Sequence, residues 1–389
     1  MTKMYEPFAG NYVWNLSVNL ALAMGANVGE IEGANALVMG VSQGGDDAGT
    51  TAFFDAWTGL ADRLVAQAEG AVAQGHALTA SEKYRRACAY YMTAERMQAR
   101  DYGPRKIAYA KMLSSFAAHV RHGARNCEQV EIPYEGKAFP ALLTLAPETN
   151  DRRRSPCMVF CNGLDSVKEM VCLADVGEAF AARGVSSLIV DQPGVGDSLR
   201  NRGFHAVIDT ERWASAAVDY LQSRAEIDSD RIGMAGWSLG GYFSPRAAAF
   251  EKRFKLCVAW GANHCWGELQ KRRQQREGKN PVPHYWDHVM WVWGQPDIET
   301  YMRFVQAITL DGVVDKITVP FLITHGSNDR QIPIEYAHRS YEQAVNSPDR
   351  ELHIFTREMG GVEHCSADNM APNRDFIADW VADRFARMV

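Results

Sequence analysis

The sequence has no apolar run of membrane-spanning length and no strong excess of either charge. A spanning helix needs about 20 consecutive apolar residues, so we expect no membrane partner. The net charge of −6 gives no reason to expect nucleic acid or an anionic membrane surface as a partner. The first residues, Met-Thr-Lys-Met-Tyr-Glu-Pro, lack the apolar core of a signal peptide, so the expected compartment is the cytoplasm.

The sequence also lacks a Cys-x-x-Cys pair, although it contains 8 cysteines. Such pairs are typical of structural zinc sites, and we expect neither a metal nor a cofactor. His284 and His288 are four residues apart, a spacing that can bind metal on a helix, but no third ligand is evident. Hydrophobic residues make up 47% of the chain and charged residues 23%, which is usual for a globular protein.

A Gly-x-Ser-x-Gly pattern is centred on Ser238. The apolar run before it predicts a strand, and residues 242–250 predict a helix. Between a strand and a helix, this pattern puts a serine on a sharp turn with its hydroxyl exposed at the end of a sheet. Gly236 and Gly240 are needed there because side chains would collide with neighbouring backbone. The alternative is a serine in an ordinary turn, which this context disfavours.

A serine nucleophile needs a base that takes its proton and an acid that orients the base. Residues 319–324 predict a short strand that leads to Asp329, and residues 351–356 predict another that leads to His364. The order of serine, acid and histidine is the one this arrangement requires. Because parallel strands share a carboxyl edge where ligands bind, we expect Ser238, Asp329 and His364 to lie close together.

Other acids and histidines are weaker candidates for these roles. Asp315 precedes a strand, so we expect it at the wrong edge of the sheet. Asp191 and Asp197 precede the serine in sequence and suit a turn better. His325 starts the loop of Asp329 and is expected to be structural.

An oxyanion in this arrangement is bound by two backbone N–H groups. The first is expected from Leu239, which directly follows the serine. The second is expected from the loop after the predicted strand at 157–161, from either Gly163 or Leu164.

Residues 1–126 predict helices and almost no strand. Apolar residues recur at helical spacing over 53–73, and Thr79 with a glutamate three residues later suggests the cap of a second helix. Pro104 interrupts that pattern, and a further helix is expected over 106–122. We expect a helical N-terminal domain that forms a lid over the active site. The alternative is a structural bundle with no part in the chemistry.

Residues 127–389 predict an α/β core. Residues 129–134 and 138–145 are expected to form a hairpin, after which short strands alternate with helices, including one over 169–183. This alternation predicts a mostly parallel sheet with helices on both faces. A cap insertion, about 263–314, interrupts the alternation and is expected to be helical.

Four of the chain's 10 tryptophans lie in this insertion. They either form the small core of the insertion or line an apolar pocket for a substrate. We name Trp266 and Trp286, together with Trp237 beside the serine and Glu268 in the insertion, as candidate pocket residues. A flat, aromatic small molecule would suit such a pocket.

The motifs Gly-Trp-Ser238-Leu-Gly-Gly, His-Gly-Ser-Asn-Asp329 and Gly-Gly-Val-Glu-His364 resemble those of the α/β-hydrolase fold. This resemblance covers residues from about 128 to the end. The helical segment 75–91 and the motif Asn162-Gly-Leu-Asp-Ser-Val-Lys-Glu169 narrow it. They are similar to the branch that holds 2,6-dihydroxypseudooxynicotine hydrolase, the fungal yellowish-green pigment hydrolases and the FrsA-like proteins.

The resemblance implies three functions that the residues leave open. The named enzymes of the branch hydrolyse a carbon–carbon bond next to a ketone, other relatives are esterases, and some FrsA-like chains are suggested to bind partners without catalysis. It also implies a homodimer whose N-terminal helices form part of the lid. Carbon–carbon hydrolases of the branch use a carboxylate in the cap, which we match to Glu268; the alternative is a surface helix residue.

Overall fold

The computed structural model describes residues 4–40, 50–275 and 282–388, which divide into two compact units. Within the described ranges, one unit holds residues 4–126 with 282–289, and the other holds the rest of the chain from Cys127 onward. The division after residue 126 lies where the sequence pattern changes from helical to alternating. Parts of the predicted N-terminal domain (1–3 and 41–49) and of the predicted insertion (276–281) lie outside the described residues.

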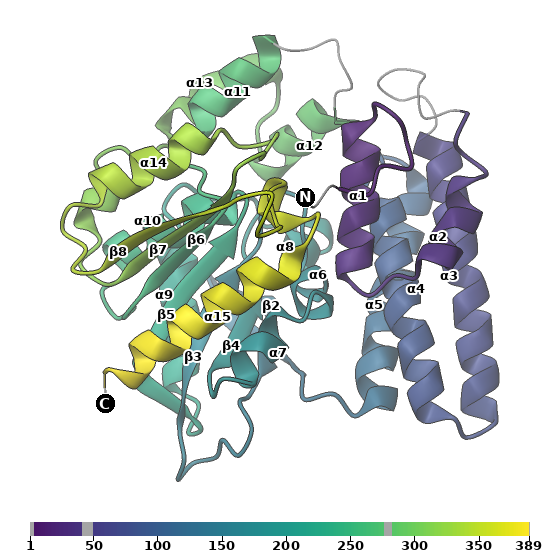
Figure 1. Ribbon diagram of the computed structural model, residues 1–389, viewed down its shortest axis with the longest axis horizontal. Coiled ribbons are helices and arrows are strands. Elements are labelled where there is room, and N and C mark those ends of the chain that lie inside the picture. The colour runs from purple at the N-terminus through teal and green to yellow at the C-terminus, as the bar shows by residue number, and fades with distance from the viewer. Residues whose placement is uncertain (1–3, 41–49, 276–281, 389) are drawn as a thin grey trace. The chain divides into compact units, whose positions relative to one another are not determined.

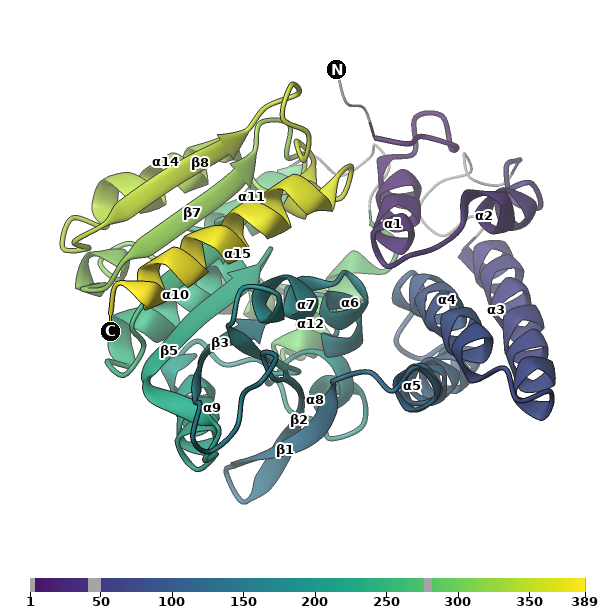
Figure 2. The same cartoon turned by 60° about the horizontal axis from the view of Figure 1, so that its bottom comes forward.

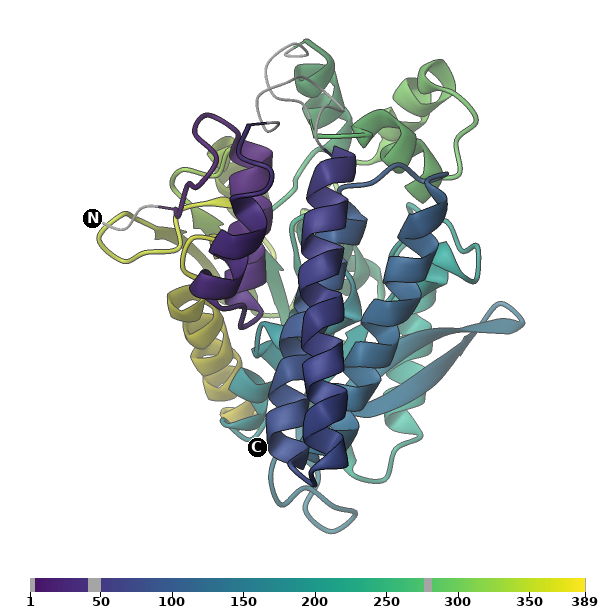
Figure 3. The same cartoon turned by 90° about the vertical axis from the view of Figure 1, so that its right-hand side faces the viewer.

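The N-terminal part of the first unit, residues 4–126, holds five helices in its described residues. They are α1 (Tyr12–Ala23), α2 (Val28–Asn35), α3 (Thr50–Ala73), α4 (Ala77–Arg96) and α5 (Gly103–Gly123). Figure 3 shows the long helices side by side, with α4 in contact with both α3 and α5. Phe53, Trp57, Leu60 and Leu64 recur at helical spacing on α3 and are buried, so this apolar stripe forms the core of the unit.

Two predicted details of these helices are wrong. The second predicted helix does not begin at Thr79: α4 starts at Ala77 after His76, so Thr79 lies inside its first turn. The helix expected over 106–122 begins earlier, because α5 starts at Gly103 and Pro104 lies in its first turn. Proline is tolerated there because the first N–H groups of a helix have no acceptor within it.

The second unit contains an eight-stranded sheet in the order β1-β2-β4-β3-β5-β6-β7-β8 (Figure 1). The strands are β1 (Glu128–Tyr134), β2 (Lys137–Thr144), β3 (Ser155–Cys161), β4 (Ser186–Val190), β5 (Ile227–Trp237), β6 (Cys257–Trp260), β7 (Phe321–Gly326) and β8 (Arg350–Phe355). β2 is antiparallel to β1 and β4, and β4, β3 and β5 to β8 are parallel. The predicted hairpin and mostly parallel sheet are therefore confirmed.

Helices cover both faces of this sheet, as Figure 2 shows. One face carries α6 (Lys168–Leu173), α7 (Val176–Ala181) and α15 (Met370–Ala386), with α15 against α7. The other carries α9 (Glu211–Gln222), α10 (Gly240–Phe250) and α14 (Ile334–Gln343). A short helix, α8 (Gly196–Arg200), follows β4. The strands β3, β4 and β6 are buried along their whole length, so the core lies between these two layers.

The helix predicted over 169–183 is in fact two short helices, α6 and α7. Asp175 separates them with a left-handed backbone, at φ 58°. Aspartate enters this region more readily than most residues, which explains a break that helical periodicity alone did not reveal. The predicted insertion contains α11 (Trp266–Gln275), α12 (Tyr285–Val292) and α13 (Ile298–Phe304). No helix in the described ranges is both long and apolar enough to span a bilayer.

Candidate active site

Ser238 lies on the turn between β5 and α10 with a left-handed backbone, at φ 58°. Such a backbone is strained for a residue with a side chain and persists only where its surroundings hold it. The Ser238 N–H donates to the carbonyl of Trp260 on the neighbouring strand, at 2.9 Å. A Cβ at Gly236 would lie 2.4 Å from Cys161 Sγ, and one at Gly240 would lie 3.0 Å from the Cys161 carbonyl oxygen. Gly236 is therefore required for this turn, and a side chain at position 240 would press on the backbone of the neighbouring strand.

The structure brings Ser238, His364 and Asp329 together in one hydrogen-bonded chain. His364 Nε2 lies 2.9 Å from Ser238 Oγ, and His364 Nδ1 lies 2.8 Å from Asp329 Oδ2. The three residues follow β5, β7 and β8. A histidine between a hydroxyl and a carboxylate can take the hydroxyl proton while the carboxylate stabilises the resulting imidazolium.

The environment of Asp329 keeps it ionised. Burial alone would raise the pKa of this carboxyl, but His364 and the N–H of Ile332 lower it below the usual value. Asp329 Oδ1 accepts from the N–H groups of Gln331 at 2.8 Å and Ile332 at 2.9 Å. Burial would lower the pKa of His364, but the Asp329 carboxylate outweighs it and raises that pKa well above the usual value. His325 contacts the carbonyl of Ile332 at 3.1 Å, which is a structural contact within the same loop.

The loop that carries His364 is held by two neighbouring carboxylates. Asp368 accepts hydrogen bonds at 2.8–3.2 Å from the three consecutive N–H groups of residues 361–363. Glu363 accepts from the amide of Asn328 at 2.7 Å and from the guanidinium of Arg330 at 3.0 Å. The Glu363 bonds join the loop of His364 to the loop of Asp329. They therefore help to fix the distance between His364 and Asp329.

The loop after β3 approaches the serine closely at Gly163. A Cβ on Gly163 would lie 2.9 Å from Ser238 Cβ and 3.3 Å from Ser238 Oγ. The Gly163 N–H, however, donates to Ser166 Oγ at 2.8 Å. Both predicted candidates for the second oxyanion donor, Gly163 and Leu164, lie on this loop, and the choice between them stays a prediction. Leu239 directly follows the serine and is the N-cap residue of α10.

Two of the predicted pocket residues, Trp266 and Trp237, are buried within the second unit. Trp266 donates from Nε1 to Tyr301 OH at 3.0 Å, which supports a role in the core of the insertion. Trp237 donates from Nε1 to Ser166 Oγ at 2.9 Å, and its ring meets that of Trp260 edge-on.

The other two predicted pocket residues also have partners elsewhere. Glu268 forms an ion pair with Arg339 at 3.0 Å and contacts Tyr336 OH at 3.3 Å. In the described part of the chain, no contact of Glu268 with the triad residues is found. Trp286 belongs to the first unit, where its ring meets that of Tyr285 edge-on.

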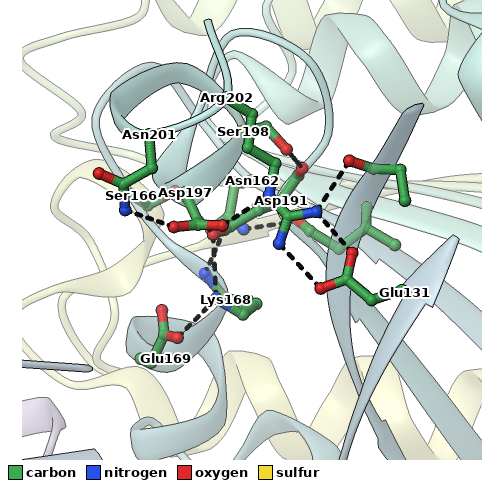
Figure 4. A network of polar contacts seen from close by, with 12 residues as sticks. Glu131, Asn162, Ser166, Lys168, Glu169, Asp191, Asp197, Ser198, Asn201 and Arg202 are labelled. Atoms are coloured by element: carbon green, nitrogen blue, oxygen red, sulfur yellow. Dashed lines mark hydrogen bonds and ion pairs between the residues drawn. The ribbon is translucent and has the colours of Figure 1, made fainter. Parts of the chain in front are cut away.

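A network of buried charged residues lies beside the loop after β3 (Figure 4). The sequence did not predict this network. Lys168 Nζ lies 2.6 Å from Glu169 Oε1 and 3.2 Å from Asp191 Oδ2. Asp191 also accepts from the N–H groups of Lys168 at 2.7 Å and Asp197 at 2.9 Å. Asp191 was expected to stabilise a turn. It also pairs with the Lys168 ammonium group, which was not predicted from the sequence. The only available signal was a Lys-Glu pair close to a buried strand.

Asn263 is a second residue that the sequence did not single out. It follows β6 closely, and its side chain is buried. Neither its Nδ2 nor its Oδ1 has a hydrogen-bond partner. Nearby, a Cβ on Gly261 would lie 3.7 Å from the nitrogen of Ser238, so the segment that leads to Asn263 runs beside the serine turn. Among the described residues, no cluster of three or more candidate metal ligands is found.

Comparisons with known proteins agree with this architecture. A family model described as the prolyl oligopeptidase family matches residues 212–385. A 2,6-dihydropseudooxynicotine hydrolase of Paenarthrobacter nicotinovorans is 26% identical over 335 residues, which cover 85% of this chain and 84% of that protein. Hydrolase acrC of Aspergillus aculeatus is 27% identical over 324 residues, covering 72% and 74%. The crystal structure of the 2,6-dihydroxy-pseudo-oxynicotine hydrolase has a TM-score of 0.76 and 23% identity, covering 95% of this chain and 96% of that one.

Proposed function

We propose that this chain, which is an α/β-hydrolase-fold enzyme, is a serine hydrolase that cleaves a carbon–carbon bond next to a ketone. The observation that carries the proposal is the chain of hydrogen bonds from Ser238 through His364 to Asp329. The substrate is a small molecule with an aromatic or β-dicarbonyl leaving group. The proposal rests on similarity to a protein whose printed name is 2,6-dihydropseudooxynicotine hydrolase and on the aromatic side chains of the insertion.

In the proposed mechanism, Ser238 Oγ attacks the ketone carbon while His364 Nε2 takes its proton. The negative charge on the carbonyl oxygen is bound by the N–H group of Leu239 and by that of Gly163 or Leu164. Collapse of this intermediate breaks the bond between the carbonyl carbon and the leaving carbon. The carbanion is protonated by His364, and water then hydrolyses the acyl-enzyme to release the acid.

The leaving group decides which bonds can be cleaved. An alkoxide leaves readily, whereas a carbanion leaves only when its charge is delocalised, as in an aromatic or 1,3-dicarbonyl group. An aromatic substrate also suits an apolar site with a few polar groups.

Ester hydrolysis is the second candidate because one observation favours it. A carbon–carbon hydrolase of the resembled branch would use a cap carboxylate, and Glu268 is the residue matched to it. Glu268 is already paired with Arg339 at 3.0 Å, and this pairing lowers the pKa of Glu268, although burial opposes it. An ionised, paired carboxylate is poorly suited to donating a proton. An esterase needs no such group.

The deciding experiment compares an aryl 1,3-diketone with the corresponding aryl ester, assayed with the same pure enzyme from pH 6 to pH 9. We expect acid release from the diketone that is lost in Ser238→Ala. Fast ester turnover with no acid from the diketone at any pH would favour the esterase.

A third possibility is a binding protein without catalysis. A fluorophosphonate probe tests it, because the probe labels only an activated serine. We expect labelling of the wild type and none of Ser238→Ala. An unlabelled wild-type protein would support the non-catalytic alternative.

A further inference from the structure

Ser166 lies where three groups beside the nucleophile meet. Its hydroxyl accepts from the Gly163 N–H at 2.8 Å and from Trp237 Nε1 at 2.9 Å. The same hydroxyl donates to Asn162 Oδ1 at 2.7 Å. Ser166 is only 6% exposed, so water cannot easily replace it as a partner. One hydroxyl therefore joins the loop after β3 to the residue that directly precedes Ser238.

Both ends of this loop are held by the end of β4. Asn162 donates from Nδ2 to the carbonyl of Val190 at 2.9 Å and exchanges two hydrogen bonds with Gln192 at 2.9 and 3.1 Å. At the other end, the Lys168 N–H donates to Asp191 at 2.7 Å. Between these anchors, the Ser166 side chain ties the middle of the loop to Trp237, which directly precedes the serine.

The position of this loop matters because Gly163 lies against the nucleophile. A Cβ on Gly163 would be only 2.9 Å from Ser238 Cβ. An oxyanion donor works when it lies about 2.7–3.1 Å from the oxygen that becomes charged. A misplacement of about 1 Å at a reacting centre can reduce the rate roughly a hundredfold.

We infer that Ser166 is a positioning residue, which holds the backbone of residues 163–164 against the serine turn, where the second oxyanion donor is expected. This inference rests on the proposed serine-hydrolase function. Ser166 touches neither the substrate nor the triad, and it acts through the backbone of residues 163–164. Its removal leaves two buried donors, Gly163 N–H and Trp237 Nε1–H, without their acceptor. The loop can then relax so that the Gly163 N–H finds another partner.

The test measures labelling of Ser238 by a small fluorophosphonate in Ser166→Ala and Ser166→Thr. In this reaction the Ser238 Oγ–P bond forms, the P–F bond breaks, fluoride leaves and His364 takes the proton. The phosphoryl oxygen becomes negative and occupies the oxyanion site. Because loss of a whole oxyanion donor typically reduces the rate by about 10²–10³, we expect a decrease of about tenfold or more in Ser166→Ala. Threonine keeps the hydroxyl, so we expect it to restore most of the rate.

Ser155→Ala is the matched control for a general loss of stability. Ser155, like Ser166, is a buried serine. It is the first residue of β3, at the opposite end of that strand from the loop of Ser166, and its hydroxyl lies 2.6 Å from Ser186 Oγ. We expect this variant to unfold more easily but to label at the wild-type rate.

Two further measurements separate positioning from structure. In Ser166→Ala, turnover should fall with little change in KM, and the pH at which the labelling rate is half-maximal should stay the same because His364 and Asp329 are untouched. Wild-type labelling in Ser166→Ala, or an equal loss in Ser155→Ala, would overturn the inference and leave the proposed function standing. Undiminished labelling in Ser238→Ala would instead defeat the proposed function.

Discussion

At the scale of single residues, the pKa of His364 sets the pH dependence of the proposed chemistry. His364 must be neutral to take the proton of Ser238, so kcat/KM should fall as the pH falls through this pKa. Asp329 raises that pKa, so the acid limb should lie above the value of about 6.5 for an ordinary histidine. In Asp329→Asn the limb should move to lower pH, and turnover should fall by roughly 10⁴. A pH–rate profile of both proteins measures this, and an unmoved limb would exclude Asp329 as the acid.

Asn263 allows a second prediction at this scale. An unpartnered buried polar group destabilises a protein by about 1–3 kcal/mol. Asn263→Leu removes both unpartnered amide atoms at similar volume, so we expect the free energy of unfolding to rise. If the amide is kept to bind a polar group of the substrate, kcat/KM should fall in the same variant. Urea unfolding and steady-state kinetics measure the two effects, and a more stable, fully active variant would show that Asn263 has no such role.

Single residues also show what the sequence could predict. Ser238, Asp329 and His364 were identifiable because each follows a predicted strand, and strand ends converge at one edge of the sheet. Ser166 was not, because a serine that joins two backbone segments and an indole has no local pattern. The pairing of Glu268 with Arg339 connects residues 71 positions apart and was equally invisible.

At the scale of elements, the buried pair between α6 and the end of β4 should stabilise the fold. Lys168 is 4% exposed and contacts both Glu169 and Asp191. Lys168→Met leaves two buried carboxylates without their cation, and breaking a buried pair from one side typically destabilises by about 3–5 kcal/mol. Urea unfolding at pH 7 measures the loss.

The control for this variant is an exposed ion pair on α13. Glu299 and Arg303 have side chains that are 81% and 66% exposed, so Glu299→Gln should change the free energy of unfolding by no more than about 1 kcal/mol. Equal stability of Lys168→Met and Glu299→Gln would show that the buried network contributes little.

Element types were predictable where periodicity is strong. The strand β3 is a short apolar run and lies where the pattern put it, and α10 follows its predicted range closely. Boundaries failed where one residue decides them. Asp175 splits a helix by adopting a left-handed backbone, and α5 starts at Gly103, three residues before the predicted start at 106, with Pro104 in its first turn. Neither choice can be read from periodicity, because both depend on the local backbone.

At the scale of the whole molecule, the division after residue 126 follows the change in sequence pattern. The residues of the predicted insertion, however, are divided between the two compact units. Residues 282–289 belong to the compact unit of the N-terminal helices, whereas α11 and α13 belong to the unit of the sheet. The sequence could not show this because the grouping depends on packing between distant segments. The lid role of the N-terminal helices and the homodimer stay predictions.

The lid prediction can be tested on the full chain by hydrogen–deuterium exchange. If the N-terminal helices and the insertion close over Ser238, a bulky aryl fluorophosphonate bound to that serine will contact segments of both units. Ordering those segments slows exchange of their amides, because local opening becomes less favourable. We therefore expect slower exchange in parts of residues 4–126 as well as in α11 to α13 after labelling. Ser238→Ala treated with the same reagent is the control for effects unrelated to the adduct. Protection confined to the loops around Ser238, Asp329 and His364 would show that the helical domain takes no part in closing the site.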